Sequence, residues 1–254
     1  MDLDFSGRAV VVTGAATGFG RATARSFAAR GARVFACDKD AAGLAETASG
    51  HPGIVPRVLD LTDRGAVAGW IADAEREAPG GAVGVLVNNA GGVLGRAFHP
   101  IEAVPFEDWE AILAVNLTAA FAVTRAAAAA MKRARRGRIV NISSGAGLRA
   151  SRTGIQAYTS AKHAVVGLTR QLAQELGPFG ITVNAVAPGL FAVSPGTMEQ
   201  WDSYGPEGQR RVVEGIALRR MGEAQDIADA VMFFASDLAG YVSGQVLPVN
   251  GGSF

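Results

Sequence analysis

The sequence predicts an α/β protein built on a doubly wound parallel sheet of about seven strands, with helices on both faces. Short β-branched or apolar runs alternate with longer helical stretches along all 254 residues, which is the pattern of a parallel sheet covered by helices. The strand-like runs are continuously apolar, as in strands that are buried on both faces. The 33 glycines are scattered rather than periodic, which indicates many tight turns between strands and helices.

The expected elements follow one another without a repeat, linker or break in composition, so residues 1–254 are expected to form one domain. The apolar runs predict strands at Ala9–Val12, Arg33–Cys37, Ile54–Leu59, Gly84–Val87, Arg138–Ile142, Thr182–Val186 and Gln245–Val249. Helices are expected between them at Gly20–Arg30, Ala41–Ser49, Arg64–Glu77, Phe106–Ala134, Gln156–Leu176 and Ala224–Ser236. The glycine- and proline-rich segment 188–220 is expected to be irregular, and such segments commonly form lids or substrate-binding loops.

Composition and charge exclude several classes of function. Apolar residues make up 49% of the chain and charged residues 19%, which excludes intrinsic disorder. The formal net charge of +1 argues against a nucleic-acid-binding surface, and the basic run at 132–136 suits the end of a helix. Cys37 is the only cysteine and the three histidines share no ligand spacing, so neither a disulfide nor a metal site is expected.

Targeting signals are not expected in this sequence. The stretch Met1–Gly7 lacks the basic start and the long apolar run of a secretory signal. No apolar run reaches the roughly 18 residues of a membrane span. We therefore expect a cytoplasmic protein with no membrane partner.

A glycine-rich turn directly follows the first expected strand. The segment Thr13–Gly20 has the spacing G-x3-G-x-G, with glycines at 14, 18 and 20. Glycine is needed where the backbone turns sharply, approaches a pyrophosphate, or packs a helix against a strand. The following helix N-terminus offers free N–H groups and a positive dipole end. This arrangement predicts a phosphate cradle, although a plain glycine turn would have a similar pattern.

Carboxylates follow the second and third expected strands. Asp38 lies 18 residues after Gly20, where a carboxylate accepts hydrogen bonds from the ribose hydroxyls of an adenosine and repels a 2′-phosphate. This position favours NAD over NADP, although the neighbouring Lys39 would partly offset the repulsion. Asp60 and Leu61 are candidates to lie beside the adenine. The alternatives are that Asp38 caps the next helix and that Asp60 is a turn or cap residue.

Tyr158 and Lys162 are four residues apart in an expected helix, so they project from the same face. A free tyrosine has a pKa near 10 and is a poor base at neutral pH. A nearby ammonium group favours the phenolate and lowers that pKa, so the pair could accept the proton of an alcohol as hydride leaves its carbon. Taken alone, the same spacing is common on helix surfaces.

Together these motifs resemble those of the short-chain dehydrogenase/reductase family along essentially the whole chain. Each motif is weak alone, but they occur in the family's order and next to the expected strands and helices. The matching positions are Thr13–Gly20, Asp60, Asn88–Gly91, Asn116, Asn141–Ser144, Tyr158 with Lys162, and Pro188–Gly189.

The resemblance implies a Rossmann-like fold and an NAD(P)-dependent oxidoreductase acting on CH–OH groups. It implies that Ser144 binds the substrate oxygen, Tyr158 is the general acid/base, Lys162 holds the nicotinamide ribose and lowers the phenol pKa, and Asn116 holds a relay water. It also implies that the family's usual homotetramer forms. Cofactor contacts are implied for Gly14, Thr17, Gly18, Phe19, Gly20, Asp38, Asp60, Leu61, Asn89, Ala90, Gly91, Ile142, Tyr158, Lys162, Pro188 and Gly189.

Two positions depart from the family pattern. Ser144 lies fourteen residues before Tyr158, whereas relatives commonly have thirteen, and the glycine-rich stretch between them could absorb one extra residue. Many relatives have a threonine four residues after the glycine of the Pro-Gly pair, near the cofactor amide. Here that position is Val193, followed by Ser194 and then Thr197.

The sequence says least about the substrate. Five apolar side chains could line a pocket for a hydrophobic or cyclic secondary alcohol or ketone, or could belong to ordinary packing or an oligomer interface. They are Val93, Leu94, Phe191, Trp201 and Tyr204. Three loop arginines could instead pair with a carboxylate, sulfonate or phosphate, namely Arg96, Arg149 and Arg152. The alternatives to an NAD-dependent alcohol dehydrogenase are a 3-oxoacyl-thioester reductase that uses NADPH and a non-catalytic cofactor-binding protein.

Overall fold

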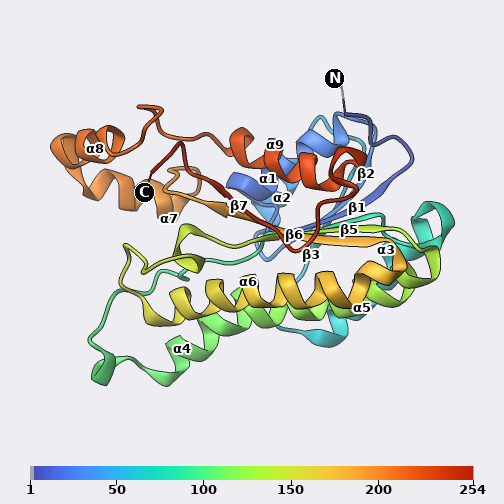
Figure 1. The fold of residues 1–254 in the computed structure, drawn as a ribbon, viewed down its shortest axis with the longest axis horizontal. Helices are drawn as coiled ribbons and strands as arrows, with labels where there is room; N and C mark the ends of the chain where they lie inside the picture. The colour runs from blue at the N-terminus through green and yellow to red at the C-terminus, as the bar shows by residue number, and fades with distance from the viewer. Residues whose placement is uncertain (1–2, 254) are drawn as a thin grey trace.

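The computed structural model describes residues 3–253 as a seven-stranded sheet flanked by helices (Figure 1). Its strand order is β3-β2-β1-β4-β5-β6-β7, and every pairing is parallel. The predicted doubly wound parallel sheet is therefore confirmed. The strands are β1 (Ala9–Thr13), β2 (Arg33–Asp38), β3 (Ile54–Val58), β4 (Val85–Asn88), β5 (Gly137–Ile142), β6 (Ile181–Pro188) and β7 (Val246–Val249).

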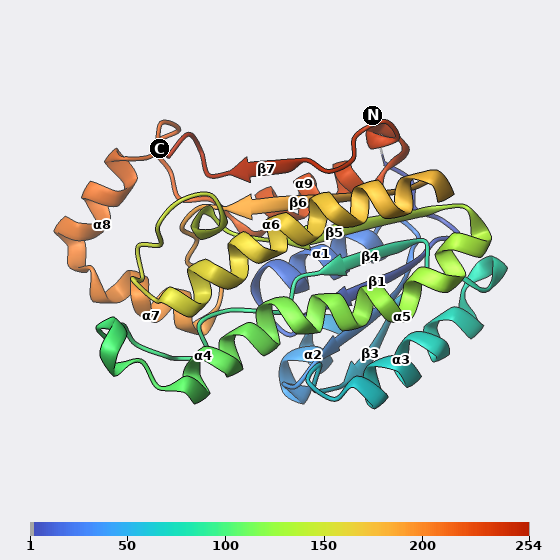
Figure 2. The same ribbon diagram turned by 60° about the horizontal axis from the view of Figure 1, so that its bottom comes forward.

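Helices cover both faces of this sheet, as Figures 1 and 2 show. One apolar core joins β1, β4 and β5 to one helix layer, and the other core joins the same sheet to the second layer. Strand side chains alternate between these cores, which explains why the strands are apolar throughout. The first layer holds α1 (Gly18–Ala28), α2 (Ala41–Ala48) and α9 (Ala224–Ala235); the second holds α3 (Arg64–Glu77), α4 (Phe106–Leu113), α5 (Ala119–Ala134) and α6 (Gln156–Leu176).

The helices α4 and α5 form one long helix with a π-helical segment, Ala114–Thr118, between them. By length and composition the whole of Phe106–Ala134 is apolar enough to cross a membrane, which the sequence reading did not expect. In the structure this helix lies in the layer beside α6 and buries Val123, Ala127 and Met131 in the core beneath the sheet. In the structure, 39% of its most apolar stretch is buried.

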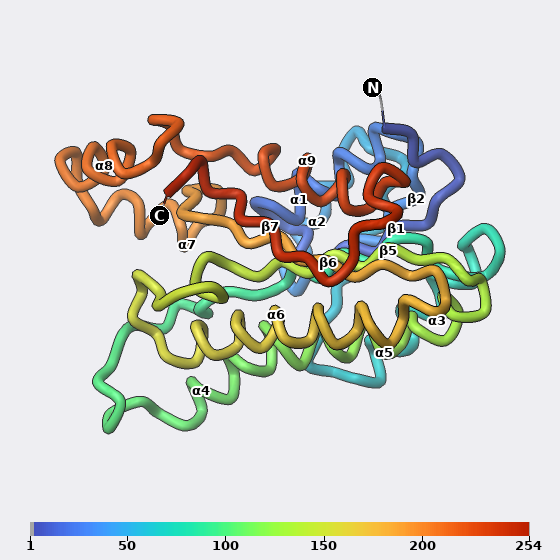
Figure 3. The backbone as a smooth tube through the Cα atoms, in the orientation of Figure 1, coloured from blue at the N-terminus to red at the C-terminus, as the bar shows by residue number. Residues whose placement is uncertain are grey.

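The segment 188–220 is not irregular throughout, which corrects the prediction. It contains α7 (Pro195–Ser203) and α8 (Gly205–Glu214). Ser194 and Thr197 form a capping box at the start of α7, and Pro195 occupies the first turn, where its missing N–H has no cost. The proline and glycine that suggested a loop therefore begin helices here. Figure 3 shows this segment projecting beyond the carboxyl ends of the strands, opposite the segment that joins β4 to α4.

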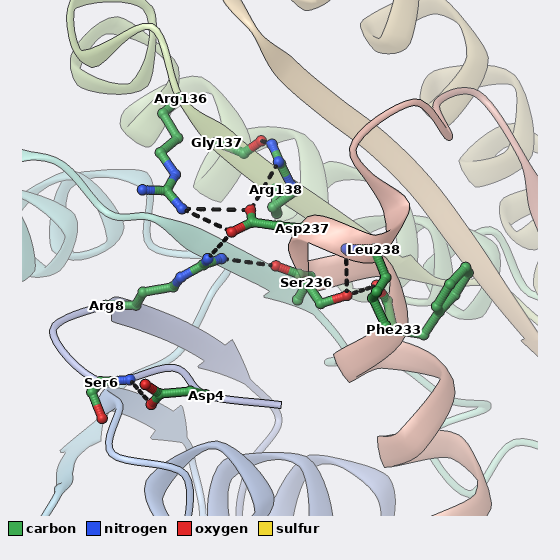
Figure 4. Close-up of polar contacts among 11 residues, drawn as sticks. Asp4, Ser6, Arg8, Arg136, Gly137, Arg138, Phe233, Ser236, Asp237 and Leu238 are labelled. Carbon is green, nitrogen blue, oxygen red and sulfur yellow. Dashed lines mark hydrogen bonds and ion pairs between the residues drawn. The ribbon is translucent and has the colours of Figure 1, made fainter. Parts of the chain in front are cut away.

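Ion pairs around Asp237 connect several elements at the amino edge of the sheet (Figure 4). Asp237, just after α9, accepts hydrogen bonds from Arg8 at 2.7 Å, Arg138 at 3.3 Å and Arg136 at 3.4 Å. Arg8 precedes β1 and Arg138 belongs to β5, so one carboxylate connects three distant parts of the chain. Arg136 comes from the basic run that ends α5, so this part of the run serves the fold.

Candidate active site

The glycine-rich turn between β1 and α1 leaves no room for side chains. Gly14 and Gly18 have φ angles of +66° and +52°, a conformation that glycine adopts at little cost. A Cβ on Gly20 would overlap the carbonyl oxygen of Gly14. Thr17 is the N-cap of α1, and its side chain makes no capping hydrogen bond within the described residues. The first N–H groups of α1 and its positive dipole end therefore face the turn, as a phosphate cradle requires.

The residues after β4 support this turn from the neighbouring strand. The Asn89 side chain donates hydrogen bonds of 2.9 Å to the carbonyl oxygens of Thr13 and Gly14. The Thr13 hydroxyl accepts from the backbone N–H groups of Asn89 and Ala90, each at 3.0 Å. The strand order reverses between β1 and β4, and ligands of open α/β sheets bind at such a switch point. The Asn89 amide thus shapes the turn itself.

Asp38 lies at the end of β2 and turns its carboxylate toward the glycine turn. One oxygen accepts from the backbone N–H of Ala16 at 3.0 Å, and the other accepts from that of Asp40 at 3.2 Å. The cap of α2 is Asp40, whose side chain accepts from Gly43 N–H at 3.1 Å. The alternative in which Asp38 caps α2 is therefore wrong.

Asp60 is engaged in a turn of its own. Its carboxylate accepts from the backbone N–H and the hydroxyl of Thr62, at 2.9 Å and 2.8 Å. These two hydrogen bonds hold the pKa of Asp60 below its usual value. Its neighbour Leu61 is buried in the apolar core beneath the sheet. Asp60 therefore belongs to a turn in this structure. Contact of Asp60 or Leu61 with the adenine stays a prediction.

Ser144, Tyr158 and Lys162 come together at the carboxyl end of β5. Ser144 follows β5 directly, and its hydroxyl oxygen accepts from the backbone N–H of Ala146 at 3.1 Å. Tyr158 and Lys162 lie one turn apart near the start of α6. The Lys162 Nζ is 5.7 Å from the centre of the Tyr158 ring and donates to the Ile142 carbonyl oxygen at 3.0 Å.

The pKa values of this cluster differ from the prediction in one respect. Burial raises the pKa of Tyr158, and its hydrogen bond with Ser144 lowers the value only in part. Burial also lowers the pKa of Lys162 to about 8, because an ammonium group loses its hydration in the core. The sequence predicted that Lys162 lowers the pKa of the Tyr158 phenol. In the part of the chain that the structure describes, this pKa is raised instead.

Asn116 is held in the π-helical segment between α4 and α5, where its side chain is 2% exposed. Its amide nitrogen donates to the carbonyl oxygens of Ile112 and Gly92, both at 2.8 Å, and its oxygen accepts from Gly92 N–H at 2.9 Å. A Cβ on Gly91 would lie 2.5 Å from this oxygen and 3.1 Å from Lys162 Nζ. Because Gly91 has no side chain, the Asn116 oxygen and Lys162 Nζ can both approach its backbone closely. π-Helical turns such as the one at Asn116, which have extra residues per turn, often occur at functional sites.

The segment after β6 closes over the glycine turn. Gly189 N–H donates to Val249 O at 3.0 Å, which pairs the Pro188–Gly189 turn with β7. A Cβ on Gly18 would lie 3.1 Å from the Val193 carbonyl oxygen. The Thr197 hydroxyl accepts from the N–H groups of Val193 and Ser194, each at 3.0 Å. Thr197 therefore holds the shape of this segment, which sequence reading did not assign to it.

Several candidate substrate contacts have other partners. Phe191 is 5% exposed and packs edge-on against Phe19, with ring centres 5.1 Å apart, so it belongs to the core. Arg96 pairs with Asp108 at 3.0 Å, and Arg149 donates to the Ser253 carbonyl oxygen at 3.4 Å.

A small apolar cluster beside Tyr158 contains a residue that sequence reading missed. Val93 and Trp109 pack with Tyr158 against the buried side chains of Ile112 and Ile155. Trp109 belongs to α4, and its place on the inward face of that helix was the available signal. This cluster forms one apolar wall next to the phenol group.

The fold and the site define a class of protein: an oxidoreductase that transfers hydride at CH–OH or ketone carbons. A family model described as enoyl-(acyl carrier protein) reductase matches residues 14–253. The chain is 38% identical to a hydroxy(phenyl)methylsuccinyl-CoA dehydrogenase subunit of Thauera aromatica, covering 96% of each chain. It is 39% identical to 2-(R)-hydroxypropyl-CoM dehydrogenase of Xanthobacter autotrophicus, covering 96% of this chain and 97% of the relative.

Solved structures agree with these relatives. A 3-oxoacyl-(acyl-carrier-protein) reductase with bound NAD from Brucella melitensis superposes with a TM-score of 0.86 at 35% identity, covering 98% of this chain and 92% of that one. The chain belongs to the short-chain dehydrogenase/reductase family.

Proposed function

We propose that the protein is an NAD-dependent dehydrogenase that interconverts a hydrophobic or cyclic secondary alcohol and its ketone. The observation that carries this proposal is the cluster of Ser144, Tyr158 and Lys162 beside the glycine turn and Asp38. The cluster follows β5 and the turn follows β1, so both lie at the carboxyl edge of the same sheet, with β4 between them. An alcohol bound between them would meet both the proton acceptor and the cofactor.

The residues at this edge fit a nicotinamide dinucleotide. A Cβ at Gly14 or Gly20 would press on the neighbouring backbone or on Asn89, so these glycines let the turn pack closely, and the free N–H groups at the start of α1 suit a pyrophosphate. Asp38 is fixed by two backbone N–H groups, and the remaining lone pairs of its carboxylate suit the two ribose hydroxyls. Ile142 and the Pro188–Gly189 turn would flank the nicotinamide.

The chain's own part in the reaction is to hold the substrate oxygen and to move one proton. When bound, the nicotinamide supplies the hydride acceptor for oxidation and the hydride donor for reduction. In oxidation, Ser144 would donate a hydrogen bond to the substrate oxygen, and the Tyr158 phenolate would take the hydroxyl proton. The charge of Lys162 would favour the phenolate against the burial that raises the pKa of Tyr158. Asn116 has one acceptor lone pair left on its oxygen, which suits a water that relays the proton to solvent.

The substrate class rests on the apolar wall of Val93 and Trp109 beside Tyr158. Two relatives are named for hydroxy compounds that carry a CoA or a CoM group. The exposed Arg152 lies six residues before Tyr158 and suits such a group. A second candidate is a 3-oxoacyl-thioester reductase, which the name of the Brucella structure favours; Asp38 argues against NADPH for either reaction. The family's homotetramer and a cytoplasmic location belong to the same proposal.

The test is turnover of the purified protein with NAD and with NADP across cyclic, steroidal, polyol and 3-hydroxyacyl-thioester alcohols. NAD-linked oxidation of one apolar class is expected. Tyr158→Phe should abolish turnover, whereas Tyr241→Phe, which alters a fully exposed phenol, should not. Full turnover by Tyr158→Phe would make the catalytic assignment wrong. Folded wild-type protein that binds NAD but turns over nothing would favour the non-catalytic alternative.

Asp38→Asn tests the choice of cofactor more sharply than Asp38→Ala. The alanine variant also strands the N–H of Ala16, which is buried, at a cost of roughly 1–3 kcal/mol. Asparagine keeps an acceptor for that N–H and removes the charge. Loss of charged hydrogen bonds to the ribose should raise the Kd for NAD about tenfold or more, and binding of NADP should improve. An unchanged NAD/NADP ratio in calorimetric titrations would show that Asp38 does not read the cofactor.

A further inference from the structure

Three consecutive residues at the end of β5 contact α6, each in a different way. The Ile142 carbonyl oxygen accepts from Lys162 Nζ at 3.0 Å. The Ser143 hydroxyl donates to the carbonyl oxygen of Lys162, also at 3.0 Å. Ser144 lies close enough to the Tyr158 phenol to lower its pKa. The short strip 142–144 therefore sets where Tyr158 and Lys162 lie relative to the sheet.

Ser143 is the member of this strip that has no role in the proposed chemistry. Its side chain is 2% exposed, and its backbone N–H donates to Val186 O on β6 at 2.8 Å. Strand alternation sends the Ile142 side chain into the core beside α1 and α9 and the Ser143 side chain to the opposite face, toward α6. The hydroxyl thus joins the sheet directly to the backbone of the helix residue that carries the ammonium group.

The contact is tightly enclosed. A Cβ on Gly147 would overlap the Ser143 hydroxyl and lie 2.6 Å from the Lys162 carbonyl oxygen. The carbonyl of a helix residue normally accepts only the N–H four residues further on, so the bond from Ser143 is an additional restraint at this one turn. A structure that merely needed to bury α6 could do so with an apolar side chain at this position.

We propose that Ser143 is a positioning residue that fixes the height and rotation of α6 at Lys162, and so keeps the ammonium group within range of Tyr158. This inference rests on the proposed function, in which the charge of Lys162 favours the Tyr158 phenolate. Without the hydroxyl, α6 is free to settle a fraction of an ångström differently at this turn. The ammonium group then supports the phenolate less well, and the tyrosine loses its proton at higher pH.

The chain supplies a matched control on the same helix. Thr169 is completely buried, and its hydroxyl accepts from the Asn141 side chain at 2.9 Å and donates to Val165 O at 2.8 Å. It also joins α6 to β5, but it lies seven residues beyond Lys162, which is about 10 Å along the helix. Thr169→Val removes a comparable buried hydroxyl and should lower the melting temperature without reaching the site.

The experiment compares Ser143→Ala with Thr169→Val in the full-length protein. In Ser143→Ala the acid limb of the kcat/KM profile for oxidation should move up by about half a pH unit, a loss of about threefold at neutral pH. Tyrosinate absorbance, assigned to Tyr158 by subtracting the Tyr158→Phe titration, should move the same way without any substrate. Thr169→Val should leave both unchanged. Equal profiles for wild type and Ser143→Ala would overturn the proposal.

A second variant guards against a misfolded Ser143→Ala. Gly147→Ala presses on the same contact from the other side and should shift the two titrations in the same direction. Failure of the proposed function has a different signature: Tyr158→Phe would then keep full turnover. If Tyr158→Phe is inactive and neither Ser143→Ala nor Gly147→Ala moves a titration, only the role of Ser143 is wrong.

Discussion

Replacing Lys162 by methionine should make the protein more stable and inactive at the same time. The side chain is 3% exposed, and burial lowers its pKa from the usual 10.5 to about 8. At 1.36 kcal/mol per pH unit, keeping this lysine protonated in the core costs about 3 kcal/mol. Methionine fills a similar volume without charge, but it leaves the Ile142 carbonyl oxygen without its partner, at a cost of about 1 kcal/mol. The net gain is about 2 kcal/mol.

The pH dependence of that gain gives the sharper test. Because the pKa of Lys162 is lower in the folded chain than in the unfolded chain, the unfolded chain binds more protons between pH 8 and 10.5. Wild-type stability should therefore rise with pH across this window. The advantage of Lys162→Met should be full below about pH 8 and should vanish above about pH 10.5.

Urea denaturation at pH 7 and at pH 10.5, together with turnover at pH 7, measures both effects. For a chain of this size, 2 kcal/mol corresponds to roughly 4–8 °C in Tm. Lys39→Met is the control, since the Lys39 side chain is exposed and its replacement should leave stability nearly unchanged. A Lys162→Met variant that is less stable than wild type at pH 7 would refute the reasoning. So would a variant that is more stable than wild type by the same amount at both pH values.

Three further predictions concern Gly91 after β4, Asp237 with its three arginines, and Thr197, which holds the segment after β6. Gly91→Ala should reduce kcat at least about tenfold and also lower Tm, because Gly91 has a φ of +157° and its Cβ would lie 2.5 Å from the buried Asn116 oxygen; steady-state rates and melting curves measure the two effects. Although burial raises the pKa of Asp237, the three arginines lower it more, so its stabilisation should be present above about pH 4 and disappear as the pH falls further. Asp237→Asn should cost about 1 kcal/mol at pH 7, since the carboxylate is 64% exposed, and progressively less as the pH falls below about 4 in urea titrations. Thr197→Val should raise the KM for the cofactor about two- to tenfold, and an unchanged KM would show that the segment it holds does not contact the cofactor.

Most of the fold could be predicted because its signals are local. The helices Arg64–Glu77 and Gln156–Leu176 have the predicted bounds, and the seven strands lie within two residues of the predicted ends. The exception is the segment that holds α7 and α8. Proline and glycine stop helices in most contexts, yet the same residues begin a helix when a capping side chain precedes them. Which of these happens depends on packing that the local sequence does not contain.

The candidate site was less predictable than the fold. The order of the motifs placed Ser144, Tyr158 and Lys162 at one edge, and the structure brings them together. Their protonation could not be read from the sequence, because the pKa of Tyr158 depends on how deeply the phenol is buried. For Phe191 the sequence left a substrate pocket and ordinary packing both open, and the residue packs against Phe19 in the core. An aromatic residue in a loop has the same sequence signal in either place.

The carboxyl and amino edges of the sheet therefore differ in how their residues affect the stability of the folded chain. At the carboxyl edge the chain accepts costly features: a π-helical segment at Asn116 and the buried ammonium group of Lys162. Each of these costs free energy in the folded state and is retained where the chemistry needs it. At the amino edge the charges are paired with one another around Asp237. Substitutions that stabilise the chain should therefore be found mainly at the carboxyl edge, and there they should reduce turnover.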